Sequence, residues 1–183
     1  MVEGSSSLNQ WGQNNFEKIV NATKQIINYF THPMSKVGIV LYATKAEVKA
    51  NFSFTRNQAN AVLSNLSYPS GWTRIGRGLN VTREQLFVGS RTNVHRVLVV
   101  FAEGTSNDAV SVASGILRGM NVTIIVIALG DWYDVKQVQR MASDPHAETT
   151  FLTNFDELDS VGWRIQEMIC SGNKIISTLV STY

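Results

Sequence analysis

Apolar runs that recur along the chain predict the strands of a sheet. Three runs are nearly unbroken, over 36–43, 96–102 and 122–129, which is typical of strands buried on both faces. The segment 46–54 alternates apolar and polar residues, as an edge strand with one exposed face does. A shorter run at 149–153 predicts the last strand. The chain therefore supplies mainly buried strands and one edge strand.

Segments with helical periodicity lie between these runs. Residues 15–30 repeat apolar side chains at i, i+3 and i+4 spacing, and Pro33 ends the segment. Asp108 is expected to cap the helix that follows it rather than to bind a ligand. Further helices are predicted over 56–66, 75–86, 108–118, 135–142 and from Asn154 or Asp156 to about 170.

This alternation of strands and helices predicts an α/β fold. A doubly wound, mostly parallel sheet would be flanked by helices on both faces. Such sheets bind ligands beyond the carboxyl ends of their strands, where the strand order switches. Three polar patches, 3–7, Thr73 and 103–104, follow a strand or lie in a loop that leads into a helix. We therefore expect the three patches to meet at one rim of the sheet.

The three patches supply only oxygen ligands, which a hard divalent cation prefers. The hydroxyls of Ser5 and Ser7 are predicted to bind the ion directly, with Thr73 as a third ligand. Glu3 and Glu103 would neutralise the cation and orient its water molecules. The alternative for the serine and threonine positions is a plain serine turn or a helix cap. The alternative for the two glutamates is an acidic rim that binds no metal.

Composition and charge exclude several classes of protein. The chain has 183 residues, which is the size of one domain, and its hydrophobic fraction of 44% is enough for a core. The formal net charge of +2 gives no reason to expect nucleic acid as a partner. No apolar stretch is long enough to insert into a membrane. The sequence contains no nucleophile–base set, P-loop or dinucleotide fingerprint, so we do not expect an enzyme.

Several features of the sequence bear on where the protein is located. No secretory signal peptide is present in this chain. Five N-x-S/T sequons occur, which favours a secreted glycoprotein. Asn121 opens a predicted buried strand, so no glycan is expected there. The four glycosylation candidates are Asn21, Asn51, Asn65 and Asn80.

Cys170 is the only cysteine, so it cannot form a disulfide within the chain. It is either a buried or half-buried thiol near a helix end, or one half of a disulfide whose partner lies outside this chain.

The polar patches and their strand context resemble those of von Willebrand factor type A domains, the family that includes integrin I domains. That family carries Asp-x-Ser-x-Ser after its first strand, a threonine before a middle helix and Asp-Gly after its fourth strand. The corresponding segments here are Glu3–Ser7, Gly71–Thr73 and Phe101–Gly104. The resemblance covers roughly residues 2–170. The predicted domain spans 1–170, with 171–183 as a C-terminal tail or linker. The stretch 142–170 is most similar to extracellular-matrix members.

The sequence departs from the family pattern at the acidic positions and at the first strand. Both family aspartates are glutamates here, Glu3 and Glu103, and the extra methylene moves each carboxylate by ~1.5 Å. Mg²⁺ or Mn²⁺ is the expected ion, and Ca²⁺ is less favoured although it tolerates looser geometry. Only Met1 and Val2 precede Glu3, so the first strand is expected to be truncated, with its neighbours in the sheet left unpaired.

The resemblance implies an extracellular adhesion or matrix-assembly module without catalysis. A partner carboxylate would complete the coordination of the cation, and the partner would be a matrix protein such as collagen. Trp11 and Trp72 flank the predicted metal rim and are candidate partner contacts, although packing roles are equally open. The resemblance also implies that Cys170 pairs with a cysteine located before the first strand. The competing hypothesis is a metal-free structural or self-assembly domain.

Overall fold

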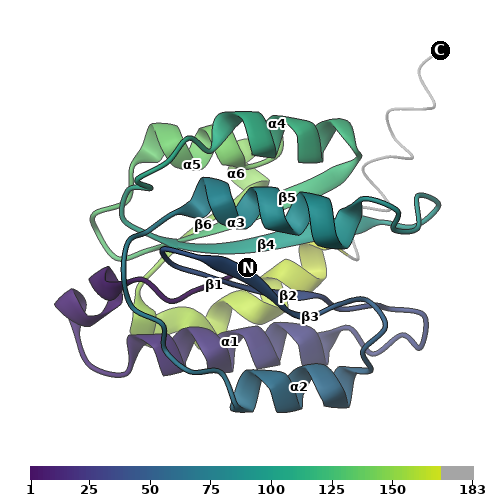
Figure 1. Ribbon diagram of the computed structural model, residues 1–183, viewed down its shortest axis with the longest axis horizontal. Helices are drawn as coiled ribbons and strands as arrows, with labels where there is room; N and C mark the ends of the chain where they lie inside the picture. Colours follow the sequence, from purple (N-terminus) through teal and green to yellow (C-terminus); the bar gives the residue numbers. More distant parts are fainter. Residues whose placement is uncertain (170–183) are drawn as a thin grey trace.

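The computed structural model describes residues 1–169, except for the side chain of Trp11. Strands and helices alternate along this part of the chain (Figure 1). The strands are β1 Val2–Glu3, β2 Ile39–Tyr42, β3 Ala46–Ala50, β4 Arg96–Glu103, β5 Val122–Leu129 and β6 Thr150–Thr153. The α-helices are α1 Asn15–Tyr29, α2 Arg56–Ser64, α3 Ile75–Thr82, α4 Ser111–Gly119, α5 Val135–Met141 and α6 His146–Thr149. The irregular helices are η1 Ser6–Trp11, the π-helix η2 Arg83–Phe87 and η3 Phe155–Ser160, after which an α-helix spans 161–169.

The strands form two three-stranded sheets that Met1 joins. The hydrogen-bonded orders are β1-β2-β3 and β4-β5-β6, and only β3 runs antiparallel to its neighbour. The backbone amide of Phe101 donates to the carbonyl of Met1 over 3.2 Å, and the Met1 amine donates to Val99 O over 2.5 Å. β1 therefore lies between β2 and β4, and the full order is β3-β2-β1-β4-β5-β6. The strand order reverses between β1 and β4, so the switch point predicted for a doubly wound fold lies there.

Helices cover both faces of the sheet, with α3, α4 and α5 on one side and α1, α2 and the helix over 161–169 on the other (Figure 1). The buried apolar side chains form one cluster on each side. The cluster under α1 is built around Ile19, Ile125 and Ile127, and the cluster under α3 and α4 around Leu79 and Leu117. Two faces buried by helices explain why β4 and β5 read as unbroken apolar runs.

The structure confirms the predicted fold class and corrects one helix cap. Asp108 does not begin α4, which starts at Ser111 with Val110 at the N-cap position and no side-chain cap. Instead, the Asp108 carboxylate accepts hydrogen bonds from the backbone of α3, across the sequence. The position of Asp108 in the sequence was compatible with an N-cap of α4. In the structure, the loop after β4 turns toward α3 instead.

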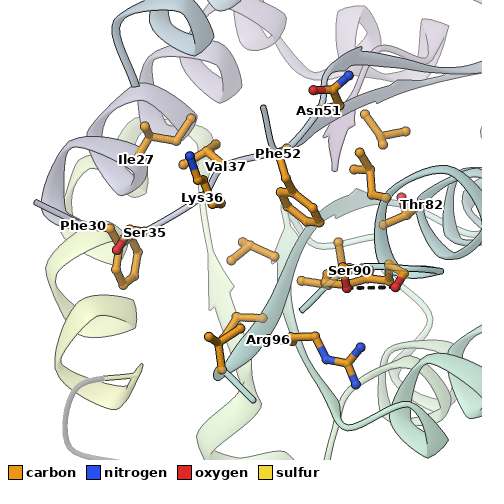
Figure 2. A pocket seen from close by; sticks show the side chains of 18 of the residues that line it. Ile27, Phe30, Ser35, Lys36, Val37, Asn51, Phe52, Thr82, Ser90 and Arg96 are labelled. Atoms are coloured by element: carbon orange, nitrogen blue, oxygen red, sulfur yellow. Dashed lines mark hydrogen bonds between the residues drawn. The ribbon is translucent and has the colours of Figure 1, made fainter. Parts of the chain in front are cut away.

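A groove of about 1170 Å³ is lined by residues of β2, β4 and the loops around them, among them Val37, Phe52 and Arg96 (Figure 2). Its lining includes Gly38 and Val40 on one side and the stretch 97–99 of β4 on the other.

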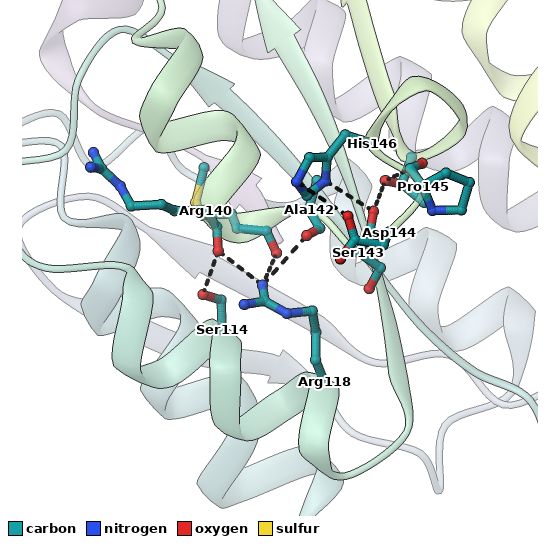
Figure 3. A network of polar contacts seen from close by, with 10 residues as sticks. Ser114, Arg118, Arg140, Ala142, Ser143, Asp144, Pro145 and His146 are labelled. Carbon is teal, nitrogen blue, oxygen red and sulfur yellow. Dashed lines mark hydrogen bonds and ion pairs between the residues drawn. The ribbon is translucent and has the colours of Figure 1, made fainter.

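Arg118 at the end of α4 fixes the C-terminus of α5 (Figure 3). Its guanidinium donates to the carbonyls of Arg140, Met141 and Ala142 over 2.9, 2.8 and 3.4 Å. Ser114 Oγ also donates to Arg140 O over 3.1 Å. The last carbonyls of a helix have no partner within the helix, so a cation placed there both bonds them and complements the helix dipole.

Replacing Arg118 with alanine is expected to lower the free energy of unfolding by about 1–3 kcal/mol, because hydrogen bonds from a charged donor to the end of α5 are lost. Urea unfolding followed by circular dichroism measures this loss. The control is Lys136→Ala, which removes an exposed cation from the same helix α5 and should change stability by less than about 0.5 kcal/mol. Equal effects of the two substitutions would contradict the capping role.

Within residues 1–169, no helix has both the length and the apolar character needed to cross a membrane.

Candidate functional site

The two predicted acidic residues meet at the switch point of the sheet. Glu3 ends β1 and Glu103 ends β4. The backbone amide of Glu103 donates to Glu3 Oε2 over 2.6 Å, although the residues lie 100 positions apart. Parallel strands that end together bring distant carboxylates to one rim, as the sequence analysis expected.

Glu3 is fully buried, and its carboxylate is held by hydrogen bonds. Ser5 Oγ donates to Oε1 over 2.7 Å, and the hydroxyl of Tyr42 donates to Oε2 over 3.2 Å. Burial raises the pKa of Glu3 to about 8, because desolvation disfavours the charged form more than these hydrogen bonds favour it. The nearby Glu103 carboxylate raises the pKa further. Glu3 is therefore a buried carboxyl group that needs a compensating positive charge to ionise at neutral pH.

Ser5 connects Glu3 to the rim. Its hydroxyl lies 2.8 Å from the hydroxyl of Ser7, and its carbonyl accepts from the Tyr68 hydroxyl over 2.6 Å. The loop stays close to the 69–71 turn because Gly4 has no side chain. A Cβ at that position would lie 2.6 Å from Pro69 Cδ.

A hollow of about 230 Å³ lies directly above these groups. Its lining combines three predicted ligands with Gly104 of the patch 103–104 and with three residues that the sequence analysis did not select, Gln10, Thr105 and Trp132. The three predicted ligands are Ser7, Thr73 and Glu103. Glu103 is 2% exposed, and its Oε2 has no hydrogen-bond partner among the described residues. A buried oxygen without a donor carries a free-energy cost that a bound cation would offset.

Thr73 is positioned by contacts with the loop after β4. Its carbonyl accepts from Asn107 N over 2.7 Å. Asp108 accepts from the amides of Gly76 and Arg77 over 2.8 Å each, and Ser106 Oγ accepts from Ile75 N over 2.9 Å. The N-terminus of helix α3 is thus capped by side chains of another loop. The Thr73 hydroxyl has no hydrogen bond to a described residue and lies beside the hollow. The alternative that Thr73 caps this helix is wrong, since Arg74 occupies that position.

Asp108→Ala is expected to lower the free energy of unfolding by about 1–2 kcal/mol, the usual effect of removing a helix cap. Because α3 begins next to Thr73, the same substitution should also weaken any metal binding at the hollow. Thermal unfolding with and without Mg²⁺ measures both effects. Asp131→Ala, which removes an exposed aspartate after β5, is the control and should leave both unchanged.

The donor set fits a hard divalent cation. Ser7, Thr73 and Glu103 present oxygen atoms to one hollow, and Ser5 and Glu3 lie beneath it and orient the Ser7 hydroxyl. Among the described residues no group of three or more His, Cys, Asp or Glu side chains is placed to hold a metal ion. Oxygen-only sites suit Mg²⁺, Mn²⁺ and Ca²⁺ better than softer ions.

The predicted partner-binding tryptophans have different places. Trp72 is 64% exposed but does not line the hollow, and its amide donates to Thr44 Oγ1 over 2.8 Å. Trp11 ends η1, and its side chain lies outside the described part of the chain. Trp132, which is 65% exposed, lines the hollow instead. Its position just after β5, a strand predicted to end at the same rim, was the signal that could have identified it.

Other predicted positions have simpler outcomes. The four glycosylation candidates, Asn21, Asn51, Asn65 and Asn80, are all exposed. Asn121 is exposed too, because it precedes β5 rather than lying inside it. Cys170 and the predicted tail 171–183 lie outside the described residues. Tyr42, which the sequence analysis did not select, holds Glu3 from the end of β2 and donates to Phe101 O over 2.5 Å.

The fold and the site together define a class of protein. It is a doubly wound α/β domain that carries serine, threonine and glutamate side chains at the switch point of its sheet. The von Willebrand factor type A domain family matches residues 1–164, so the chain belongs to that family.

Similar sequences occur in extracellular matrix proteins. Matrilin-1 of Homo sapiens is 25% identical over 178 residues, which cover 93% of this chain and 35% of that protein. Vitrin of Mus musculus is 25% identical over 177 residues, covering 93% and 26%. The collagen alpha-1(XX) chain of Mus musculus is 28% identical over 178 residues, covering 93% and 13%. The chain spans about a third or less of the length of these three relatives.

Solved structures support the fold. Proximal thread matrix protein 1 from the mussel byssus superposes with a TM-score of 0.83 at 23% identity, over 92% of this chain and 44% of that one. Another structure of the same mussel protein has its MIDAS motif occupied by zinc; its TM-score is 0.82 at 24% identity, with the same coverage.

Proposed function

We propose that this chain is an extracellular protein-binding module that uses a divalent cation to bind an acidic group on a matrix partner. The observation that carries this proposal is the convergence of Ser7, Thr73 and the unpartnered oxygen of Glu103 on one hollow. Matrix relatives such as matrilin-1 and collagen alpha-1(XX) favour a matrix protein, with collagen as one candidate.

In this proposal the hydroxyls of Ser7 and Thr73 and the carboxylate of Glu103 hold Mg²⁺ or Mn²⁺. The ion, when bound, supplies an open coordination position for a partner carboxylate. Ser5 and Glu3 act from beneath, because Glu3 fixes the Ser5 hydroxyl and Ser5 fixes Ser7. Trp132 beside the hollow and Trp72 on the same rim would contact the partner around its acidic residue. No step involves catalysis.

The proposal extends to location and modification. A secreted protein would carry glycans at the exposed Asn21, Asn51, Asn65 and Asn80, and Cys170 would form a disulfide with a cysteine outside this chain. The four asparagines are exposed, and none of them lines the hollow.

A metal-free structural or self-assembly domain is the second candidate. It is favoured by the hydrogen bonds that already engage the Glu3 carboxylate through Ser5, Tyr42 and the Glu103 amide. A carboxyl group held in this way and protonated at neutral pH would need no cation.

Partner binding separates the two candidates. We expect the chain to bind immobilised collagen or another acidic matrix protein in Mg²⁺, and to lose at least about tenfold in affinity in EDTA or on Glu103→Gln, since charge-assisted contacts are the stronger ones. Asp131→Asn is the control for removal of a surface charge. Binding that is unchanged by EDTA would favour the metal-free domain.

A further inference from the structure

Three basic side chains lie at the end of the sheet that carries the hollow. Arg74 and Arg77 belong to the start of α3, and Lys45 belongs to the turn that follows β2. Lys45 and Arg77 are exposed, and Arg74 is half-buried. Glu47 is the only acidic residue of the sequence over 18–83. Lys45, Arg74 and Arg77 are called the cationic surface below.

Hydrogen bonds hold the cationic surface next to the candidate cation site. The amide of Trp72 donates to Thr44 Oγ1 over 2.8 Å, and the guanidinium of Arg77 donates to Thr44 O over 3.0 Å. On the other side, the amide of Ser6 donates to Gly71 O over 2.8 Å. The start of α3 is therefore fixed between the serine loop after β1 and the turn after β2.

The positive charges of the cationic surface are not neutralised by the described residues. The side chains of Arg74 and Lys45 have no hydrogen bond or ion pair, and the guanidinium of Arg77 bonds only the Thr44 carbonyl. The Glu47 carboxylate accepts from a neighbouring lysine of β3 over 2.5 Å. Asp108 is engaged by backbone amides of α3. The surface is therefore available to attract an anionic group of a partner.

The position of these charges favours a short acidic segment of a protein. Arg74 directly follows Thr73, which lines the hollow, and Arg77 is its neighbour on the first turn of α3 because the two are three residues apart. Side chains on one face of an extended segment lie about 6–7 Å apart, at every second residue. A segment with one carboxylate at the hollow would thus present its next acidic side chains to this surface.

We propose that the cationic surface selects partners whose metal-binding carboxylate is flanked by further acidic residues. This inference rests on the proposed function, in which a cation in the hollow binds the first carboxylate. Arg74, Arg77 and Lys45 attract the flanking carboxylates, and the exposed ring of Trp72 packs against the segment between them. Exposed charges act mainly on specificity and on the rate of association. The surface therefore separates acidic partners from neutral ones that also carry a single carboxylate.

A long sulfated polysaccharide is the less favoured occupant. Such a chain would need a continuous row of cations, and Glu47 follows Lys45 closely along β3. Three cations beside one hollow match a segment of a few residues better.

The test compares two peptides on the full chain in Mg²⁺. Both have a central glutamate, flanked two and four residues away on each side by aspartate in one peptide and by asparagine in the other. We expect the aspartate peptide to bind roughly fivefold tighter by fluorescence anisotropy, and added NaCl to reduce this ratio. Arg74→Gln/Lys45→Gln, which removes no hydrogen bond, should bring the ratio close to one. Lys36→Gln should keep it, because Lys36 is an exposed cation before β2, at the opposite end of that strand.

Metal dependence separates failure of this inference from failure of the proposed function. The Mg²⁺ shift of the unfolding midpoint should be the same in the wild type and in Arg74→Gln/Lys45→Gln, since neither residue lines the hollow. Equal affinity for the two peptides, with both lost in EDTA, would overturn the cationic surface and leave the proposed function standing. A preference for the aspartate peptide that persists unchanged in EDTA would support the surface and contradict the cation-dependent function.

Two further results would overturn the inference. One is an aspartate peptide that does not bind measurably although Mg²⁺ shifts the midpoint. The other is binding of a heparin fragment, lost in Arg74→Gln/Lys45→Gln, without binding of either peptide, which would assign the surface to a sulfated polysaccharide.

Discussion

Millimolar Mg²⁺ or Mn²⁺ is expected to raise the unfolding midpoint of this chain, and the Ser7→Ala/Thr73→Ala variant is expected to lose that response. A ligand that binds only the native state stabilises it by RT ln(1 + [L]/Kd), which is about 2.7 kcal/mol at a hundredfold excess over Kd. For a domain of this size the midpoint would rise by roughly 5–10 °C. Differential scanning calorimetry against EDTA measures the shift.

The matched control for this experiment is Ser6→Ala. Ser6 lies between the two serines of the site, but its hydroxyl donates to Gly71 O over 3.0 Å, and Ser6 does not line the hollow. It should therefore keep the full metal response. If the wild-type midpoint does not move with either ion, the cation-dependent mechanism is wrong and the metal-free domain remains. A response retained by the double variant would place the ion elsewhere.

The second large effect concerns Glu3 and pH in the metal-free protein. Its pKa in the folded state is about 8, whereas the ordinary glutamate value is 4.5. Between these values the native state retains a proton that the unfolded state has released, so the free energy of unfolding falls as pH rises through this window. Each pKa unit corresponds to about 1.36 kcal/mol, which puts the total loss of unfolding free energy on the order of 5 kcal/mol.

Comparison with Glu3→Gln isolates this effect. Glutamine keeps the shape and does not titrate, so in EDTA the variant should gain stability relative to the wild type as pH rises from 5 to 8. Burial lowers the pKa of the Met1 amine to about 5, which gives a pH dependence of opposite sign, but both proteins share it. Urea unfolding at several pH values provides the difference. Parallel pH curves for the two proteins would show that Glu3 is ionised in the fold without a cation.

Much of the fold follows from local sequence patterns. The apolar run at 122–129 coincides with β5, and the run at 96–102 with most of β4. Helices cover both faces of these strands, so consecutive residues along them are apolar and the pattern can be recognised in the sequence. The order of strands and helices then places the three polar patches at one rim, because ligand sites in such sheets lie beyond the carboxyl ends of the strands.

The details of the site depend on contacts between distant segments. Only the folded structure shows that Ser5 and Glu3 lie beneath the hollow, whereas Ser7, Thr73 and Glu103 line it. The pattern Glu-x-Ser-x-Ser does not say which of these side chains lie beneath the hollow and which line it. Their depth depends on the contacts that Tyr42 and Glu103 make with Glu3.

The cap of α3 and the lining of the hollow also could not be predicted from local sequence patterns. Asp108 caps a helix more than thirty residues before it in the sequence, and Trp132 reaches the hollow from the loop after β5. Local spacing specifies which residues can form a strand, a helix or a cap. Which element a loop residue meets is decided by the packing of the sheet and its helices, because that contact joins segments whose separation along the chain carries no local signal.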